Sequence, residues 1–328
     1  MREKLSKAII IKCTATVFLL FMSNYVFSQV QYARKAQTPE DKRYFGDREI
    51  LTDSVRKANP SEKKSLYLIK DSLYRYTLGE GRSTKAGLVL VTSEGIIITD
   101  PLRYSGAIWL KDELKKRFNL PVKYVIYSHA HYDHIGGAEI FQADGAKIIA
   151  QQNALEVVLG EKLPTAVPDI TFIGHEYKLQ LGGQTVILNW IAPCHSNSMI
   201  NIYYPRQKVM HATDYCPVNA LPWNDFTDFY YDGWIENLEW LSKQDFEILE
   251  AGHYEIGKKA NVALDMEYLK NLHDQVLDLI RRGCSWDQLY RLVKMDEKFK
   301  TWIGAQDMFL RNISGMYRWV SNHRRGVW

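Results

Sequence analysis

The chain has 328 residues, of which 46% are hydrophobic, and its 42 basic residues nearly balance its 38 acidic residues. A chain of this size and composition can bury one large core, or one core with an attached subdomain. The near-neutral charge, without a basic stripe of interleaved aromatic residues, argues against a nucleic-acid-binding protein.

The first 28 residues have the pattern of a secretory signal peptide. Four basic residues precede the uncharged, largely apolar residues 13–26, and Val26 and Ser28 fit the small-residue positions of a cleavage site. The apolar stretch is shorter than the span of about 20 residues that a membrane helix needs. We therefore expect a periplasmic or secreted protein without stable membrane insertion after cleavage; an uncleaved anchor is the alternative. Removal of these residues leaves 38 basic and 37 acidic residues.

Residues 29–65 form a polar segment that contains Pro39 and Pro60. This composition predicts an arm that packs over the core or is partly loose. From residue 66 to residue 257, short β-rich runs alternate with helical ones, including residues 87–99, 109–118, 147–150 and 185–192. The alternation predicts an α/β protein in which helices cover β-sheets.

A histidine-rich hexapeptide follows the apolar, β-rich residues 123–128. It reads His129-Ala130-His131-Tyr132-Asp133-His134. Two histidines that are two positions apart on an extended chain point the same way, so His129 and His131 can bind one ion. Asp133 and His134 fall in the turn before the helical residues 138–142 and can face a second ion.

Three further candidate ligands, His195, Asp214 and His253, each stand at the end of an apolar stretch. Together with the hexapeptide they provide five imidazoles and two carboxylates, a donor set that suits zinc. One catalytic zinc needs only three protein ligands, so seven candidates predict two Zn²⁺ per chain, with Fe or Mn as other options. His211 is the nearest rival ligand because it lies on the strand that leads to Asp214.

The hexapeptide and its distal partners, in this order, resemble the metallo-β-lactamase superfamily over residues 73–257. The resemblance implies an αββα sandwich of two mixed β-sheets flanked by helices. It assigns one metal to His129, His131 and His195, the other to Asp133, His134 and His253, and a bridging position to Asp214. It also implies that Asp100, at the end of an apolar strand, braces the site loops.

Such a site generates a zinc-bound hydroxide near neutral pH and polarises the carbonyl group under attack. We expect Asp133 to bind metal and also to act catalytically, by orienting the water or relaying its proton. Cys194 and Cys216 are interpreted as small buried residues without a catalytic role. Three cysteines remain after leader cleavage, and a disulfide between Cys194 and Cys216 is left open.

The candidates for the substrate cleft are the aromatic residues Trp223, Phe226 and Tyr254. If these side chains wall the cleft, they favour apolar or ring-bearing acyl substrates. The alternative for the segment after Asp214 is that its aromatic residues only pack against the helix expected near residues 232–243. Two departures from the family pattern, Ser196-Asn197-Ser198 after His195 and Tyr254 after His253, are expected to alter the cleft loops.

The remaining residues, 258–328, are predicted to form a C-terminal helical extension. Apolar residues recur three and four positions apart in residues 263–281, 285–293 and 301–320, and Gly283 separates the first two runs.

The leading hypothesis is an exported dinuclear zinc hydrolase that acts on a small molecule by cleaving a β-lactam, a lactone or a thioester. The export signal favours a β-lactam or a lactone over a glutathione thioester. One alternative is a mononuclear iron oxidoreductase of the same fold that oxidises persulfides. Another is a non-catalytic metal-binding protein of the cell envelope. The substrate and the oligomeric state are left open by the sequence.

Overall fold

The computed structural model describes residues 62–226 and 228–323. The expected signal peptide and all but the last four residues of the expected polar arm lie outside these residues. The first strand already includes Lys64, so the arm as it was predicted overlaps the sheet. Within the described part of the chain, no helix is long and apolar enough to span a membrane.

The first sheet has seven strands in sequence order, β1 to β7. Strands β1 to β4 are antiparallel neighbours, whereas β4 to β7 are parallel. The strands are β1 (Lys64–Lys70), β2 (Leu73–Leu78), β3 (Lys85–Thr92), β4 (Gly95–Thr99), β5 (Val122–Ile126), β6 (Lys147–Gln151) and β7 (Ile170–Phe172). The parallel strands require crossovers, which include α4 (Tyr104–Phe118), α5 (Tyr132–Ile135), α6 (Ala138–Gln142) and α7 (Gln152–Gly160).

The second sheet has the strand order β12-β11-β10-β9-β8, and only its β11/β12 pair is parallel. Its strands are β8 (Glu176–Leu181), β9 (Gln184–Asn189), β10 (Asn201–Tyr204), β11 (Val209–His211) and β12 (Ile248–Glu250). Helix α8 (Tyr231–Lys243) connects β11 to β12. Both sheets are therefore mixed, as expected.

Three apolar clusters hold the layers together. Side chains of both sheets, such as Leu90 and Leu188, share one cluster between the sheets. Leu110 of α4 and Phe141 of α6 pack in a second cluster against the outer face of the first sheet. Strand β4 is buried at all five positions, because it lies between these two clusters and both of its faces are covered. The predicted αββα sandwich is confirmed.

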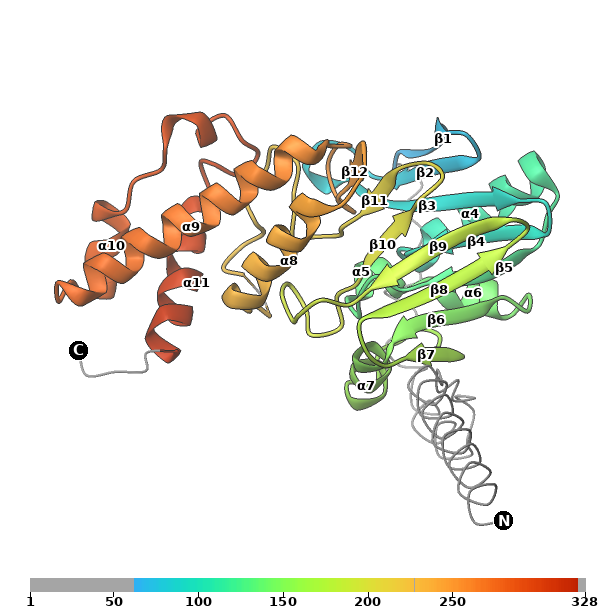
Figure 1. Cartoon of the computed structure of the whole chain (residues 1–328), viewed down its shortest axis with the longest axis horizontal. Helices are drawn as coiled ribbons and strands as arrows, with labels where there is room; N and C mark the ends of the chain where they lie inside the picture. Colours follow the sequence, from blue (N-terminus) through green and yellow to red (C-terminus); the bar gives the residue numbers. More distant parts are fainter. Residues whose placement is uncertain (1–61, 227, 324–328) are drawn as a thin grey trace, which may run out of the picture.

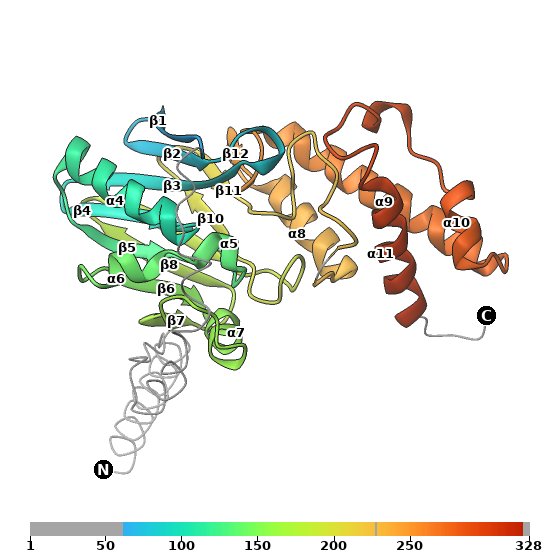
Figure 2. The same cartoon turned by 180° about the vertical axis from the view of Figure 1, so that it is seen from behind.

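The C-terminal extension contains α9 (Lys259–Arg281), α10 (Trp286–Leu292) and α11 (Phe309–Asn322), and it lies beyond one end of the sandwich (Figure 1 and, from behind, Figure 2). Gly283 follows α9 with a φ of +78°, as expected for a helix-terminating glycine. The third helix was predicted to begin at residue 301, which is wrong. Ile303 instead forms a parallel bridge with Ala220, and residues 304–308 form turns, so α11 begins only at Phe309.

The extension does not have a core of its own. The third apolar cluster joins Met210 and Leu249 of the second sheet to Trp234 of α8, Leu272 of α9 and Met316 of α11. Helix α9 lies against both α8 and α11. The extension is thus continuous with the outer helical layer of the sandwich, on the side of β11 and β12.

Candidate metal centre

Five of the seven candidate ligands lie in loops that follow strand ends, whereas Asp133 and His134, which were expected in a turn, lie in the short helix α5. His129 and His131 come directly after β5, and His131 is the N-cap of α5. Asp214 follows β11, and His253 follows β12. His195 lies in the loop between β9 and β10. The fold brings these loops together at one edge of the sandwich, which is where ligand sites of layered α/β proteins form.

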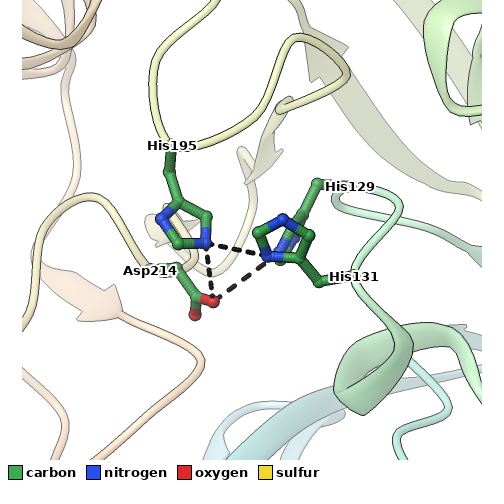
Figure 3. Close-up of side chains that lie close together, drawn as sticks. All are labelled: His129, His131, His195 and Asp214. Atoms are coloured by element: carbon green, nitrogen blue, oxygen red, sulfur yellow. Dashed lines mark hydrogen bonds and ion pairs between the residues drawn. The ribbon is translucent and has the colours of Figure 1, made fainter. Parts of the chain in front are cut away.

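His129, His131, His195 and Asp214 form the first group of possible metal ligands (Figure 3). Their ligand atoms all lie within 4.8 Å of one another. His195 Nε2 is 3.0 Å from His131 Nδ1 and 3.3 Å from Asp214 Oδ2. His129 Nε2 approaches the same carboxylate oxygen at 3.6 Å.

Asp133, His134 and His253 form the second group, again within 4.8 Å. The Nε2 atoms of His134 and His253 are 3.2 Å apart. Asp214 reaches this group as well, because its Oδ2 is 3.2 Å from His134 Nε2 and its Oδ1 is 3.2 Å from His253 Nε2. Asp214 therefore lies between the two groups, in the position expected of a bridging carboxylate.

The convergence of these atoms fits metal binding by each group. His129 Nε2 and Asp214 Oδ1 are buried and have no hydrogen-bond partner in residues 62–226 and 228–323. Burial lowers the pKa of His129 and of His195, and neighbouring imidazoles act in the same direction, so both rings offer free lone pairs at neutral pH. Imidazole nitrogens and carboxylate oxygens are the donors that zinc takes at catalytic sites.

Hydrogen bonds on the far side of four of the five rings, those of His129, His131, His134 and His253, fix which nitrogen faces the centre. His134 Nδ1 lies 3.1 Å from Asp100 Oδ2, and His131 Nε2 lies 2.9 Å from Asp228 Oδ2. His129 Nδ1 is 2.9 Å from the Ser128 hydroxyl, and His253 Nδ1 is 2.9 Å from the carbonyl oxygen of residue 84. Such partners orient metal-binding histidines and increase their basicity.

Asp100 is the centre of this supporting network, which confirms its predicted bracing role. Its carboxylate accepts hydrogen bonds from the backbone N–H and the hydroxyl of Ser128, at 2.8 and 2.7 Å. Burial opposes ionisation of Asp100, but hydrogen bonds from His134 and His211 outweigh it and hold its pKa well below the usual value. His211 Nε2 lies 3.2 Å from Asp100, and His211 belongs to neither ligand group.

The comparisons with known proteins agree with this geometry. The family model described as the metallo-beta-lactamase superfamily matches residues 81–253, which is just over half of the chain. The chain belongs to the metallo-β-lactamase superfamily. The structure is similar to the solved structure of the metallo-β-lactamase from Pontibacter korlensis. The superposition covers 64% of this chain and 100% of that one, with a TM-score of 0.57 and 18% sequence identity. This likeness bears on the fold alone.

The curated relatives are distant in sequence. The chain is 25% identical to the 2,4-dinitroanisole O-demethylase subunit alpha of a Nocardioides strain, over 55% of this chain and 56% of that protein. It is 26% identical to metallo-beta-lactamase IND-1 of Chryseobacterium indologenes, over 50% of this chain and 67% of that protein. The chain thus spans little more than half the length of the first of these relatives.

The His253 loop is supported by a buried ion pair that could not be recognised from the sequence. Arg75 on β2 pairs with Glu250, whose side chain is fully buried. Glu250 Oε1 accepts a hydrogen bond of 2.9 Å from Gly252 N, and Arg75 Nη2 donates one of 2.8 Å to the carbonyl oxygen of Tyr254. A buried glutamate signals that a partner exists, but nothing local in the sequence indicates that Arg75 is that partner.

Asp228 also escaped the sequence analysis, although it contacts a candidate ligand, His131. It is an exposed loop residue with a φ of +58°. The hydrogen bond from His131 lowers the pKa of its carboxyl group, although partial burial opposes the effect. No local sequence pattern distinguishes such an aspartate from a solvated one.

A cleft of about 830 Å³ opens onto the centre. Its lining includes His131, Asp133, His195, Asp214 and His253. Trp223 and Tyr254 line it as well, as expected. Phe226 was also predicted to line this cleft, which is wrong. It is only 2% exposed and packs against Phe229 and Trp234, because apolar contacts in the third cluster outweigh exposure to the cleft.

The unusual loop after His195 has a structural role. Ser196 and Ser198 are buried, and Ser198 Oγ accepts a hydrogen bond of 3.1 Å from the N–H of Ala130. The carbonyl oxygen of Asn197 accepts one of 2.9 Å from Trp190 Nε1. None of the residues 196–198 is among the cleft-lining residues, whereas His195 of the same loop is, so an effect of this loop on the cleft stays a prediction. The serines connect the His195 loop to the hexapeptide.

The three cysteines in the described part of the chain, Cys194, Cys216 and Cys284, are free thiols, so the disulfide that the sequence left open between Cys194 and Cys216 does not form. Both residues are fully buried, as predicted. Burial raises the pKa of Cys194 to about 12, and Cys216 Sγ donates a hydrogen bond of 3.0 Å to Asp265 Oδ2. A buried, protonated thiol is a poor nucleophile, in agreement with the interpretation of both residues as packing residues.

Proposed function

We propose that this protein is an exported dinuclear zinc hydrolase that cleaves a cyclic or activated acyl bond of a small molecule. β-Lactams and lactones rank ahead of thioesters as substrates. The observation that carries the proposal is the pair of ligand groups that share Asp214 at the bottom of an open cleft.

When bound, two divalent metals in such a site lower the pKa of a shared water toward neutrality and stabilise the developing oxyanion. The chain itself provides a general base. Asp133 is 32% exposed at its side chain and lines the cleft. Burial opposes its ionisation, but His134, His253 and Lys85 together keep the pKa of its carboxyl group below the usual value. Asp133 is therefore ionised at neutral pH and able to accept the proton of the attacking water.

The lining of the cleft supports an acyl substrate with an apolar or ring-bearing part. Trp223 has 59% of its surface exposed, and Tyr254 stands beside His253. Both side chains offer a flat apolar surface to a ligand. The names of several relatives, which are metallo-beta-lactamases, support a cyclic amide as the first substrate class to test.

The second ligand group argues against the mononuclear iron alternative. A single iron would be held by two histidines and one aspartate, which leaves the other candidate ligands without a function. The structure instead brings Asp133, His134 and His253 within 4.8 Å of one another beside the first group. The cleft that opens onto these ligands favours a catalytic over a purely metal-binding protein.

Export remains part of the proposal and depends on residues 1–28 alone. The test is N-terminal sequencing of the protein recovered outside the cytoplasm, which we expect to begin at Gln29. A protein that retains residue 1 in that fraction would contradict cleavage. A chain that begins at residue 29 serves as the control and should stay in the cytoplasm.

The test of the activity combines metal analysis with a substrate panel. The panel contains nitrocefin, an acyl homoserine lactone, an acyl thioester and 2,4-dinitroanisole, the last because of one relative's name. Two zinc ions per chain and hydrolysis of one of the three acyl compounds would support the proposal. One iron per chain with oxygen uptake would contradict it. Chelation should abolish turnover, and added zinc should restore it.

A further inference from the structure

The C-terminal extension contributes to the cleft, although the family match ends at His253. Asp307 and Met308 line the same cleft as His131 and His253. Arg82, from the turn between β2 and β3, donates a hydrogen bond of 2.7 Å to Asp307 Oδ2. The cleft is thus bounded on one side by the metal-site loops and on another by a turn that precedes α11.

Backbone hydrogen bonds fix this turn against the chain that follows Asp214. Ile303 N donates to the carbonyl oxygen of Asn219 at 2.9 Å, and Leu221 N donates to the carbonyl oxygen of Ile303 at 2.8 Å. The two segments therefore run side by side as a parallel bridge between Ala220 and Ile303. Because Asn219 is only five residues from Asp214, this bridge ties the extension to the metal-site loop.

Helix α11 supports the next part of the same wall. Asn312 is fully buried, and its Nδ2 donates to the carbonyl oxygens of Pro222 at 3.0 Å and Asn224 at 2.6 Å. A Cβ atom at Gly315 would lie only 2.1 Å from the carbonyl oxygen of Asp225. Both contacts place the loop that carries Trp223 directly against α11.

The wall that results is apolar and carries no unbalanced charge. Leu221 and Met308 are nearly buried and Trp223 is mostly exposed, and all three line the cleft. The guanidinium of Arg82 is neutralised by Asp307, and Lys85 lies 3.7 Å from Asp133. Among the cationic side chains that line the cleft, only Arg103 has no ion-pair partner within the described residues.

We propose that Leu221, Trp223 and Met308 form the specificity-determining wall of the cleft and bind the apolar part of the substrate. This inference rests on the proposed function and deepens it. The chemical class is an acyl compound with an apolar group next to its reactive bond. The Arg82–Asp307 pair keeps this side of the cleft neutral and so disfavours a negatively charged group there.

The test measures binding to the zinc-loaded protein rather than turnover. Calorimetry compares ethanethiol, a small thiol able to bind zinc, with 2-phenylethanethiol, which adds an apolar ring. We expect the wild-type protein to bind the second thiol at least about tenfold more tightly, a difference of about 1.4 kcal/mol, because the wall buries the apolar ring. Met308→Ala and Trp223→Ala should each reduce this ratio about fivefold and leave ethanethiol affinity unchanged.

Leu310→Ala is the matched control, because Leu310 is half-exposed two residues away and lies outside the cleft. It should keep the wild-type ratio. A second variant, Asp307→Asn, changes a side chain that is half-exposed and should fold normally. By leaving Arg82 unpaired, it should increase the affinity for 3-mercaptopropionate severalfold relative to ethanethiol.

The outcomes separate this inference from the proposed function. If the wild-type protein binds both thiols but the ratio is unchanged in Met308→Ala and Trp223→Ala, the wall assignment is wrong and the metal centre stands. If Asp307→Asn leaves the affinity for 3-mercaptopropionate unchanged, the neutralising role of the ion pair is wrong. If the wild-type protein takes up zinc but binds neither thiol, this inference is contradicted and the metal centre stands, whereas failure to take up zinc would contradict the metal centre itself.

Discussion

The two sides of the cleft are built in different ways. On the metal side, His129, His134 and Asp100 are fully buried and are held by hydrogen bonds from behind. On the other side, Trp223 is mostly exposed and its loop is held by Asn312 of the extension. The metal centre therefore depends on the sandwich that the superfamily shares, whereas the proposed substrate wall also depends on Met308 and Asn312, which lie beyond the family match. Variants on the two sides should affect different measurements.

The largest expected effect lies on the metal side, at His131. His131→Ala removes one donor of the first ligand group, and we expect turnover to fall by about a thousandfold or more with loss of bound metal. The side chain is 26% exposed, so the fold should persist by circular dichroism. His175→Ala changes an exposed histidine outside both groups and serves as the control. Wild-type activity in His131→Ala would refute the site assignment.

Asp214→Asn tests whether the two ligand groups act as one unit. The carboxylate contacts histidines of both groups, and an amide is a weaker metal ligand. We expect metal affinity to fall about 100-fold, as judged by competition with a chromophoric chelator. Unchanged stoichiometry and affinity would show that Asp214 is a bystander and that the two groups are independent.

On the wall side, Asn312→Ala should reduce stability and substrate affinity but not metal content. It leaves the carbonyl oxygens of Pro222 and Asn224 and the hydroxyl of Tyr268 without their partner. We expect the free energy of unfolding to fall by about 2 to 4 kcal/mol, and KM to rise more than kcat falls. Tyr268→Phe removes one of the three hydrogen bonds and should cost about 1 kcal/mol. Loss of metal in Asn312→Ala would show that the two sides are coupled.

The smallest effect is expected at the outer contact of the wall, between Asp225 and Arg318. The hydrogen bond from Arg318 lowers the pKa of the Asp225 carboxyl group. A lowered pKa stabilises the folded protein above the unfolded value near 3.9, and this contribution is lost as the pH falls through the folded value. Asp225→Asn should cost less than about 0.5 kcal/mol at pH 7, because the pair is largely exposed. Urea unfolding at pH 7 and at pH 3 measures it, and an equal difference at both values would contradict the assignment.

Much of the metal side could be predicted because its information is local or carried by residue type. The hexapeptide places four ligands within six residues, and a strand before it and a helix after it set their directions. Asp100 could be assigned as a brace because its strand resembles the superfamily strand that ends in a structural aspartate. The roles of Asp228 and Arg75 could not be assigned from the sequence, because their partners His131 and Glu250 lie 97 and 175 residues away along the chain.

The wall could not be predicted to the same degree, because an aromatic residue is equally suited to line a cleft and to pack in the core. Trp223 and Phe226 are three residues apart in one segment, yet one lines the cleft and the other lies in the core. The predicted start of the third C-terminal helix, α11, was wrong for a related reason. The apolar spacing of residues 301–308 is compatible with a helix, but the bridge of Ile303 to Ala220 provides backbone hydrogen bonds that a helix would break.

The sequence by itself determined the donor set, the ligand order and the layered fold class, because residue chemistry and periodicity follow directly from the order of amino acids. Only the tertiary structure decided that Asp214 contacts both ligand groups, that His211 serves Asp100, and that the C-terminal extension forms a wall of the cleft. These features are contacts between distant segments. They depend on how the sheets and helices pack, since the free energy of packing is shared over the whole core and has no local sequence pattern.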